Sequence, residues 1–449
     1  MHGGGTRLFT LSKDRNEYKK MVRTLSGENS KSNMSPDITN NALMDFAKEK
    51  LRSEEAVTLI HDPSDIRKPY STDLEDIGYV RSLDNKIIHG YSTHNIIALP
   101  SKSKIVTLLS NKTYSNRAGN FLSQETLSKL ESGIDFDGRE SARKIYESGN
   151  YFNKKTISKE EISRVSQAIK QSNPAIKISH VLDREFDDDD YIDLISNILG
   201  DKFVIRSKKS RCLDEVDENG KKVRLIVSSF DNSHQLSFQK LSIKKTVIQD
   251  GKILVEWKVY GKIFAVKITI LDRIGNNVFD EAMLLLTNKA LFSFDDAYGV
   301  YKEYLKRSRI EYVFKFLKEG LGWEEMQVRE FKAIENLISL CFYVAAYLYD
   351  IGDQEAYDDY AVMLSELGDG KGIISRHFIL KGIHVVSNHY KYPENYPKFT
   401  YPKGSRYLVK DSGTSQSPKS TRQRAKLRAA TVLRPLTFAL NEQSVYLPQ

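Results

Sequence analysis

The sequence predicts an α/β protein with a mixed sheet, an inserted β-rich module and flanking helices. Residues 56–62 (AVTLIHD) and 178–183 (ISHVLD) are short apolar runs with the length of buried strands, and each ends at a carboxylate. Residues 119–172 between them follow a mostly helical pattern. Residues 209–280 instead contain short β-rich runs separated by polar turns, and residues 281–288 (EAMLLLTN) return to a buried strand. These changes in the predicted secondary structure along the chain place a β-rich insert inside an α/β domain.

The remaining elements follow from local patterns. Residues 41–55 are expected to form a helix before the first strand, and residues 91–100 and 104–110 an antiparallel pair. The acidic run Asp187–Asp190 is expected to begin a helix, because carboxylates suit the N-terminal dipole. The expected organisation is an N-terminal arm and helix at 1–48, the α/β domain at 49–208 and 281–350 around the insert at 209–280, C-terminal helices at 351–390, and a basic, partly disordered tail at 391–449.

The charge distribution favours a polyanionic partner. The net charge is +9, with +7 in residues 202–280 and +8 in residues 391–449, so the remainder carries −6. Two basic regions around an acidic body suggest nucleic acid, although a solvated basic tail is the simpler alternative. Two distant cysteines, no secretory signal and no expected membrane span predict a cytoplasmic protein without disulfides.

Residues 304–318 contain a polar stripe. Tyr304, Arg307, Glu311 and Lys318 are spaced so that on one continuous helix they fall within an arc of roughly 60° and a length of about 21 Å. A carboxylate among cations suits a site that handles phosphates and a metal, whereas the alternative is a solvated, salt-bridged face. A neighbouring face suited to burial carries Ile310, Val313, Phe314 and Leu317.

Three acids are candidates for one site: Asp62 and Asp183 at strand ends, and Glu311 on the helix. Asp65 is the alternative to Asp62, but it is expected in the following turn, where it would bond the backbone. Three converging carboxylates can hold two divalent ions about 3.5–4 Å apart for an in-line displacement at phosphorus. Hard oxygen ligands favour Mg²⁺ or Mn²⁺ over Zn²⁺.

The arrangement resembles the DDE transposases of bacterial insertion sequences, in particular the insertion-sequence-four family. Its Y-x2-R-x3-E-x6-K signature is matched at every spacing by the residues of the polar stripe. The second-acid motif matches Val181-Leu182-Asp183-Arg184, and the first, D-x-[ST]-D, matches Asp62-Pro63-Ser64-Asp65. Leu286-Thr287-Asn288 before the signature is also similar to the family.

The resemblance implies a ribonuclease-H-like catalytic domain in which Asp62, Asp183 and Glu311 hold two Mg²⁺ or Mn²⁺ ions. It implies cleavage of transposon ends and joining of the 3′ end to target DNA, by a homodimer at the bacterial nucleoid. A DNA-binding relic without chemistry and a nuclease without strand transfer remain alternatives. The implied DNA contacts are Tyr304, Arg307, Lys318, Arg184 and Trp257, the last through a flipped base, although Trp257 also suits sheet packing.

Overall fold

The computed structural model describes residues 14–27, 34–103, 105–216, 218, 220–243, 246–353, 358–369 and 374–391. The chain divides into two compact units, Met1–Ala346 and Tyr347–Gln449, which are treated separately below. The expected tail at 391–449 lies outside the described residues apart from its first position.

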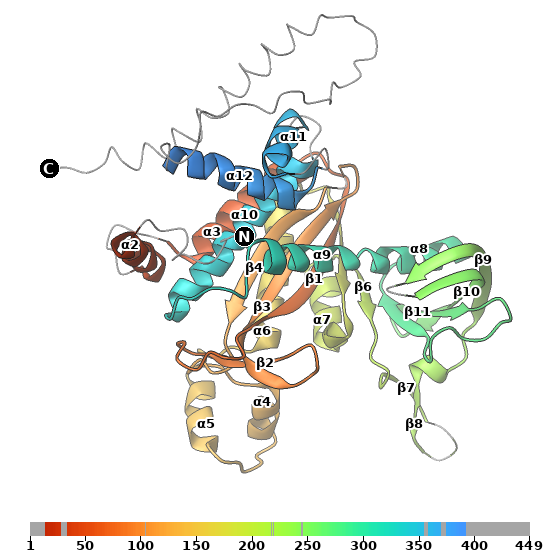
Figure 1. Cartoon of the computed structure of the whole chain (residues 1–449). Coiled ribbons are helices and arrows are strands. Elements are labelled where there is room, and N and C mark those ends of the chain that lie inside the picture. The colour runs from red at the N-terminus through yellow and green to blue at the C-terminus, as the bar shows by residue number, and fades with distance from the viewer. Residues whose placement is uncertain are drawn as a thin grey trace, which may run out of the picture. The chain divides into compact units, whose positions relative to one another are not determined.

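A ten-stranded mixed sheet forms the centre of the first unit (Figure 1). Its order is β2-β3-β1-β5-β6-β12-β11-β10-β9, and β4 also pairs with β3. The expected α/β fold with a mixed sheet is therefore confirmed. The strands are β1 (Ala56–Arg67), β2 (Gly78–Arg81), β3 (Ile87–Pro100), β4 (Thr107–Tyr114), β5 (Lys177–Leu182), β6 (Lys202–Arg206), β9 (Asn232–Ile243), β10 (Thr246–Tyr260), β11 (Ile263–Leu271) and β12 (Met283–Thr287).

The strands of the insert extend the main sheet instead of forming a sheet of their own. β1, β5 and β6 are parallel, whereas β12 pairs antiparallel with β6 and is followed by antiparallel β11, β10 and β9. Among the described strands, β7 (Cys212–Val216) and β8 (Lys222–Arg224) alone form a separate two-stranded ribbon. Hydrogen bonds thus run without a break from the α/β domain into the insert.

One face of the sheet packs on helices α3 (Pro36–Leu51) and α6 (Lys154–Ser172). Successive side chains of a strand point to opposite faces, so alternate residues of β1, β3 and β5 supply this layer. The apolar cluster between sheet and helices contains Met44, Ala47, Leu51, Val57, Leu59, Ile96, Ala98, Leu109, Val165, Ile169, Ile176 and Ile178.

The opposite face carries α8 (Phe294–Leu305) and then α9 (Ser308–Lys315), one after the other (Figure 1). α8 contacts β10, β11, β12, β6 and β5, and α9 contacts β1. Ser293 begins α8 with a capping box, and Phe294 at its first turn lies against His234 of β9, with ring centroids 4.3 Å apart. The helical path therefore starts over the insert and ends over the first strand.

The first unit also contains shorter helices. As expected, the acidic run begins a helix: Asp188 caps α7, and a π-helical turn at Leu194–Ile198 follows it. Within the described residues one helix, α10, is long and apolar enough to cross a membrane over Phe331–Ile351, by length and composition only. Its apolar window is 61% buried, however, as in the core helix of a soluble protein. The shorter helices are α2 (Arg15–Ser26), α4 (Gln124–Glu131), α5 (Arg139–Glu147) and α7 (Asp189–Asp193), whereas the longer α10 (Phe331–Asp353) begins in this unit and continues past its last residue, Ala346.

The second unit contains α11 (Asp358–Leu367) and α12 (Arg376–Lys391), which pack against each other. A glycine permits this close approach: a Cβ at Gly382 would lie 1.8 Å from the carbonyl oxygen of Leu364.

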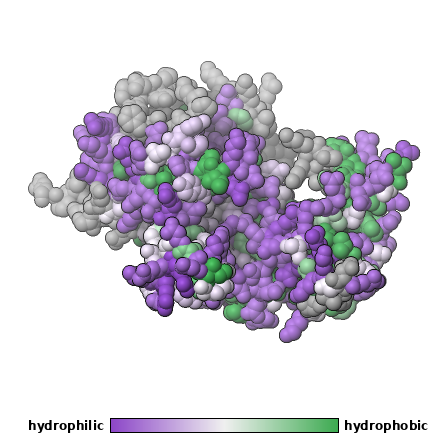
Figure 2. Space-filling model, turned by 90° about the horizontal axis from the view of Figure 1, so that it is seen from below, coloured by the Kyte–Doolittle hydropathy of each residue, from purple (hydrophilic) through white to green (hydrophobic). Residues whose placement is uncertain are grey.

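The face of the protein in Figure 2 is mostly hydrophilic, with a few separate apolar spots. Isolated apolar side chains of this kind are normal on a protein surface, whereas a large continuous patch would indicate an apolar partner.

The continuous sheet predicts that the insert and the α/β domain unfold together. Val255→Ala in β10 removes two buried methyl groups from a fully buried side chain, so we expect the free energy of unfolding to fall by about 2 kcal/mol. Val259→Ala in the same strand is the control, because this side chain is 63% exposed and we expect a change below about 0.5 kcal/mol.

The two tryptophans provide the measurement, because Trp257 lies in β10 and Trp323 is fully buried outside the insert. In urea titrations of the Trp257→Phe and Trp323→Phe proteins, Val255→Ala should shift both fluorescence transitions equally. A shift seen by only one reporter would show that the insert is an independent unit.

Candidate active site

The register of the parallel strands brings Asp62 and Asp183 together. The last paired residues of β1 and β5 are Ile60 and Val181, so two residues further along each strand Asp62 comes to lie beside Asp183 on the same face. The β5–β6 register extends this row to Arg206. The separation of 121 residues along the chain thus becomes one strand spacing.

The first strand was expected to end at Asp62. It instead continues to Arg67 in an antiparallel pair with β3. Pro63 is tolerated because the β5 ladder has already stopped, so β1 has become an edge strand on that side. Asp65 consequently lies in the strand and not in a turn. Its carboxylate accepts hydrogen bonds from the Ser92 hydroxyl and the Arg81 backbone, which supports the choice of Asp62.

The expected single helix at 304–318 is wrong in detail. α8 ends at Leu305, α9 begins at Ser308, and a π-helical turn covers Phe316–Gly320. Between the helices the backbone bonds run three residues back, including Arg307 N to Tyr304 O. Side chains three apart eclipse each other in such a 3₁₀ turn. Tyr304 and Arg307 can therefore reach the same carboxylate.

Arg307 lies at the centre of the candidate site. Its Nη2 is 2.9 Å from Asp62 Oδ1, 3.0 Å from Asp62 Oδ2 and 3.1 Å from Asp183 Oδ2, while its Nη1 is 3.1 Å from Glu311 Oε1. The Tyr304 hydroxyl donates to Asp183 Oδ1 at 3.3 Å. The Asp62 Oδ1 and Asp183 Oδ2 atoms are therefore at most 6.0 Å apart, the 2.9 and 3.1 Å contacts laid end to end. All three sequence-predicted acids meet on one guanidinium.

Burial controls the protonation of this cluster. Burial raises the pKa of Asp62 to about 7, although the charge and hydrogen bonds of Arg307 oppose the shift. Burial, followed by the charge of Asp183, raises the pKa of Tyr304 to about 12. Burial alone would lower the pKa of Arg307, but Asp62 and Asp183 raise it overall, so the guanidinium stays charged.

Glu311 differs from the two aspartates in its exposure. Its side chain is 63% exposed, whereas the side chains of Asp62 and Asp183 are 11% and 27% exposed. Glu311 lies in the first turn of α9, whose buried face includes Ile310 and Val313. The apolar face expected from the sequence thus fixes the helix, and the third carboxylate remains open to solvent.

Lys318 does not join the three acids. Its Nζ donates to the Asp65 carbonyl at 2.9 Å and pairs with Glu324 at 3.2 Å. Glu324 also pairs with Arg67 at 2.9 Å. Lys318 therefore joins the π-helical turn to the far end of β1, and Glu324 is a counter-ion that sequence reasoning missed.

Arg184 follows Asp183 directly, and its backbone N–H donates to Asp183 Oδ1 at 2.7 Å. Within the described residues its Nε is buried without a hydrogen-bond partner. A role for its guanidinium in binding DNA remains a prediction.

Trp257 lies on the same face of the sheet as the acids, but far from them. The paired residues continue from Arg206 through Leu285 and Val266 to Trp257. Five strand spacings of about 4.8 Å separate β1 from β10, which gives about 24 Å. Trp257 is only 8% exposed, on the face that α8 covers, so here it packs the sheet. Its predicted stacking on a base is untested.

Sequence reasoning also missed Arg206 and Asn95. Arg206 ends β6 beside Asp183, and its charge opposes the rise in the pKa of Tyr304. Asn95 of β3 is the register partner of Asp62 and donates to its carbonyl at 3.2 Å. The signal for Arg206 was present, since a third short apolar strand, KFVIR, ends in a charged residue.

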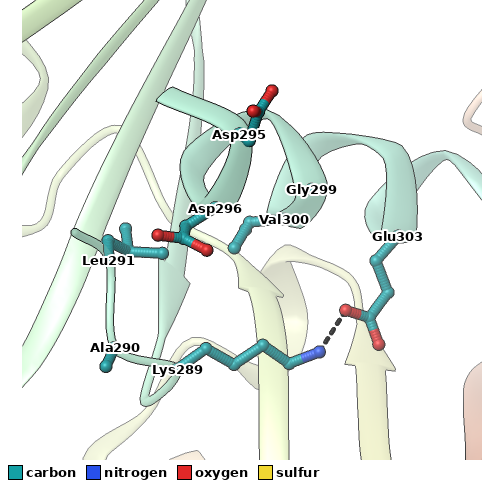
Figure 3. A pocket seen from close by; sticks show the side chains of 8 residues that line it. All are labelled: Lys289, Ala290, Leu291, Asp295, Asp296, Gly299, Val300 and Glu303. Carbon is teal, nitrogen blue, oxygen red and sulfur yellow. Dashed lines mark hydrogen bonds and ion pairs between the residues drawn. The ribbon is translucent and has the colours of Figure 1, made fainter. Parts of the chain in front are cut away.

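A cavity of about 290 Å³ beside α8 is separate from this site. Figure 3 shows Lys289 reaching Glu303 across it, while Asp295 points away. Asp296 is used by the capping box of α8. The cavity therefore offers no free cluster of ligands. Its lining residues are Lys289, Ala290, Leu291, Asp295, Asp296, Gly299, Val300 and Glu303.

The donor chemistry of the three acids fits a divalent cation, because Mg²⁺ and Mn²⁺ prefer carboxylate oxygens. Among the described residues, however, no three acidic, histidine or cysteine side chains are already arranged to hold a metal ion. The physical reason is that the guanidinium of Arg307 occupies the position between the carboxylates. A metal can enter only if Arg307 moves away.

Comparison with known proteins adds no family: no protein-family model matches this sequence, and no curated protein matches it significantly.

The network predicts that Arg307 is required for stability when no metal is present. Arg307→Met leaves Asp62 and Asp183 without a counter-ion, so we expect a loss of about 3–5 kcal/mol at pH 8 in EDTA. Adding Asp62→Asn to the Arg307→Met protein should restore part of the lost free energy of unfolding. Arg309→Met, at an exposed position of the same helix, is the control for urea unfolding. Equal losses at 307 and 309 would contradict the assignment.

The raised pKa of Asp62 predicts a specific pH dependence. The folded-state pKa of about 7 lies above the ordinary 3.8, so the neutral acid favours folding. This stability is fully present below about pH 4 and is lost as the pH rises through 7. Relative to Asp62→Asn, the free energy of unfolding of the wild type should fall by a few kcal/mol between pH 4 and pH 8 in EDTA. Urea titrations at each pH test this, and parallel curves for the two proteins would rule it out.

Proposed function

We propose that the protein is a DDE transposase, which cleaves transposon-end DNA in a metal-dependent reaction and joins the 3′ end to target DNA. The observation that carries the proposal is the meeting of Asp62, Asp183 and Glu311 on the single guanidinium of Arg307. The sequence alone predicts these acids as one site, although 311 − 62 = 249 residues separate Asp62 from Glu311. Chance placement of surface carboxylates does not account for it.

The sheet supports a ribonuclease-H-like catalytic domain. An antiparallel group, β4-β3-β1, continues into the parallel strands β5 and β6, and the acids lie on the central strands β1 and β5. Glu311 comes from a helix that follows the insert. Two strands and one helix thus supply the ligands, as the resemblance implies.

Asp62, Asp183 and Glu311 are the residues that would hold Mg²⁺ or Mn²⁺. Two such ions supply activation of the attacking oxygen and stabilisation of the leaving oxygen in phosphoryl transfer. The chain's own contribution is to keep the two aspartates beside each other and largely buried, while Glu311 at the open side completes the set. Without a metal, Arg307 is the counter-ion that the three acids share.

Once released from the acids, Arg307 is available to a DNA phosphate, because a guanidinium binds phosphate oxygens in bidentate fashion. Lys306, whose Nζ is 3.3 Å from the Thr58 hydroxyl, and Arg206 provide further positive charge beside β1 and β5. Tyr304 orients Asp183 through its hydroxyl. Positive charge at this point favours binding of the DNA backbone.

DNA is the proposed partner, at both the transposon ends and the target, with a homodimer on paired ends at the bacterial nucleoid. The net charge of +7 in residues 202–280 supports a polyanion beside the site. One observation favours a second candidate, a DNA-binding relic without chemistry: all three acids are already ion-paired with Arg307. A nuclease without strand transfer is the third.

The proposal predicts that Glu311→Gln abolishes cleavage. We expect a loss of at least about 10³-fold, because metal ligation contributes several kcal/mol to the transition state. The substrate is DNA from either flank of the gene, incubated with Mg²⁺ or Mn²⁺, and the product is followed on denaturing gels. Glu319→Gln is the control, since this side chain is 70% exposed and pairs only with Lys315 among the described residues.

Three results separate the candidates. Cleavage that depends on Glu311, followed by joining of pre-cut ends to a plasmid, supports the transposase. Cleavage without joining identifies a nuclease, and unimpaired DNA binding without cleavage by the wild type identifies the relic. Cleavage that persists in Glu311→Gln refutes the proposed site.

A further inference from the structure

A chain of buried polar side chains lies on the opposite face of the sheet, directly behind the candidate site. His61 Nε2 is 2.9 Å from His180 Nδ1, and His180 Nε2 is 3.0 Å from Asp201 Oδ2. Both histidines are fully buried and Asp201 is 3% exposed. The site already described uses none of these three residues.

The members of this chain neighbour the proposed metal ligands in sequence. His61 precedes Asp62 in β1, and His180 lies three residues before Asp183 in β5. Because successive side chains of a strand alternate, His61 points to the α6 face while Asp62 points to the α9 face. The chain therefore acts on the same two strands from behind.

The position of the bond along the strands is informative. The β1–β5 backbone ladder stops at Ile60 and Val181, one residue short of His61. His180 is the ladder partner of Leu59, so the His61–His180 bond crosses diagonally between the strands and ties the first residue of β1 beyond the ladder to β5.

Asp201 anchors the chain and sets the direction of its hydrogen bonds. It immediately precedes β6, and it accepts the Ser166 hydroxyl and pairs with Lys170 at 2.6 Å, both from α6. Burial would raise the pKa of Asp201, but the bonds from His180, Lys170 and Ser166 hold it below its ordinary value. A carboxylate only accepts, so His180 donates from Nε2, and a neutral His180 accepts at Nδ1 from His61.

Core packing alone does not explain this arrangement. Val57 and Leu59 precede His61 on the same face of β1, and Ile178 precedes His180 on β5, so an apolar residue would continue the pattern. The polar residues instead leave His61 Nδ1 buried without a partner among the described residues. Directional hydrogen bonds fix a geometry that apolar contacts leave adjustable.

We propose that the His61–His180–Asp201 chain positions the two aspartates for the metal. It does so by fixing the spacing of β1 and β5 at the end of their backbone ladder, so that the carboxylates of Asp62 and Asp183 are presented at one separation. The inference rests on the proposed function, since it concerns the metal site of that function. All three are positioning residues, because they act through the strands and touch no substrate.

Substitutions at His61 test the chain with Mn²⁺ as the probe. Gln has an amide nitrogen at the reach of Nε2 and keeps the donor, whereas Asn is one methylene shorter and Phe has no donor. We expect the Kd for Mn²⁺, measured on the full chain by the EPR signal of free Mn²⁺, to rise about tenfold in His61→Phe and His61→Asn. His61→Gln should stay within about threefold of the wild type.

His94→Phe is the matched control. Its ring stacks on His61 with centroids 6.0 Å apart and it is 2% exposed, but the hydrogen-bonded chain just described does not include it. It therefore disturbs the same buried region without cutting the chain, and its Kd should stay within about twofold. Thermal unfolding of each variant verifies folding. If His61→Phe does not fold, the comparison of Asn with Gln decides.

Only the Mn²⁺ binding that disappears in the Asp183→Asn protein is assigned to the proposed metal site, and the Kd values refer to that binding. Wild-type affinity in both His61→Phe and His61→Asn would overturn the positioning role, as would equal weakening in His61→Phe and His94→Phe. If instead the wild type and Asp183→Asn bind Mn²⁺ alike, the proposed metal site itself fails, and the positioning role fails with it. The two failures are thus distinguishable.

Discussion

The organisation of this protein depends on one guanidinium and the three carboxylates that surround it. Asp62 and Asp183 are drawn together by the parallel register of β1 and β5, and their charges would repel each other inside the protein without a cation between them. Arg307 supplies that cation from a helix on the other side of the insert. A buried charge pair of this kind is costly to break, although it adds little stability over an apolar core. Its presence therefore supports the proposed site.

The sheet determines what can reach this site. Because β12 pairs with β6, the insert is attached edge to edge, and α8 can lie across both parts before α9 arrives over β1. The 3₁₀ turn between the helices then aligns Tyr304 with Arg307. The polar chain on the far face holds the same two strands from behind. The acids are thus constrained from both faces of one layer.

Much of the fold could be predicted from local patterns. Apolar runs of strand length located β1, β5 and β12, and positions at strand ends and on a helical stripe selected Asp62, Asp183 and Glu311. The attachment of the insert to β6 could not be predicted, because pairing between strands distant in sequence leaves no local pattern. The break in the helix at Leu305 was also hidden, since LKRSR contains ordinary helix-forming residues. His61 and His180 were hidden for another reason: one histidine in an apolar strand does not reveal its partner.

The distance between Arg307 and its partners along the chain has a consequence for synthesis on the ribosome. Asp62 emerges 245 residues before Arg307, and Asp183 also emerges earlier. Until the last third of the polypeptide has been translated, the two carboxylates lack the guanidinium of Arg307. Strand β6 also lacks its neighbour β12. The nascent first half therefore cannot settle into its final layer, and the centre of the protein is completed only when the later segment arrives.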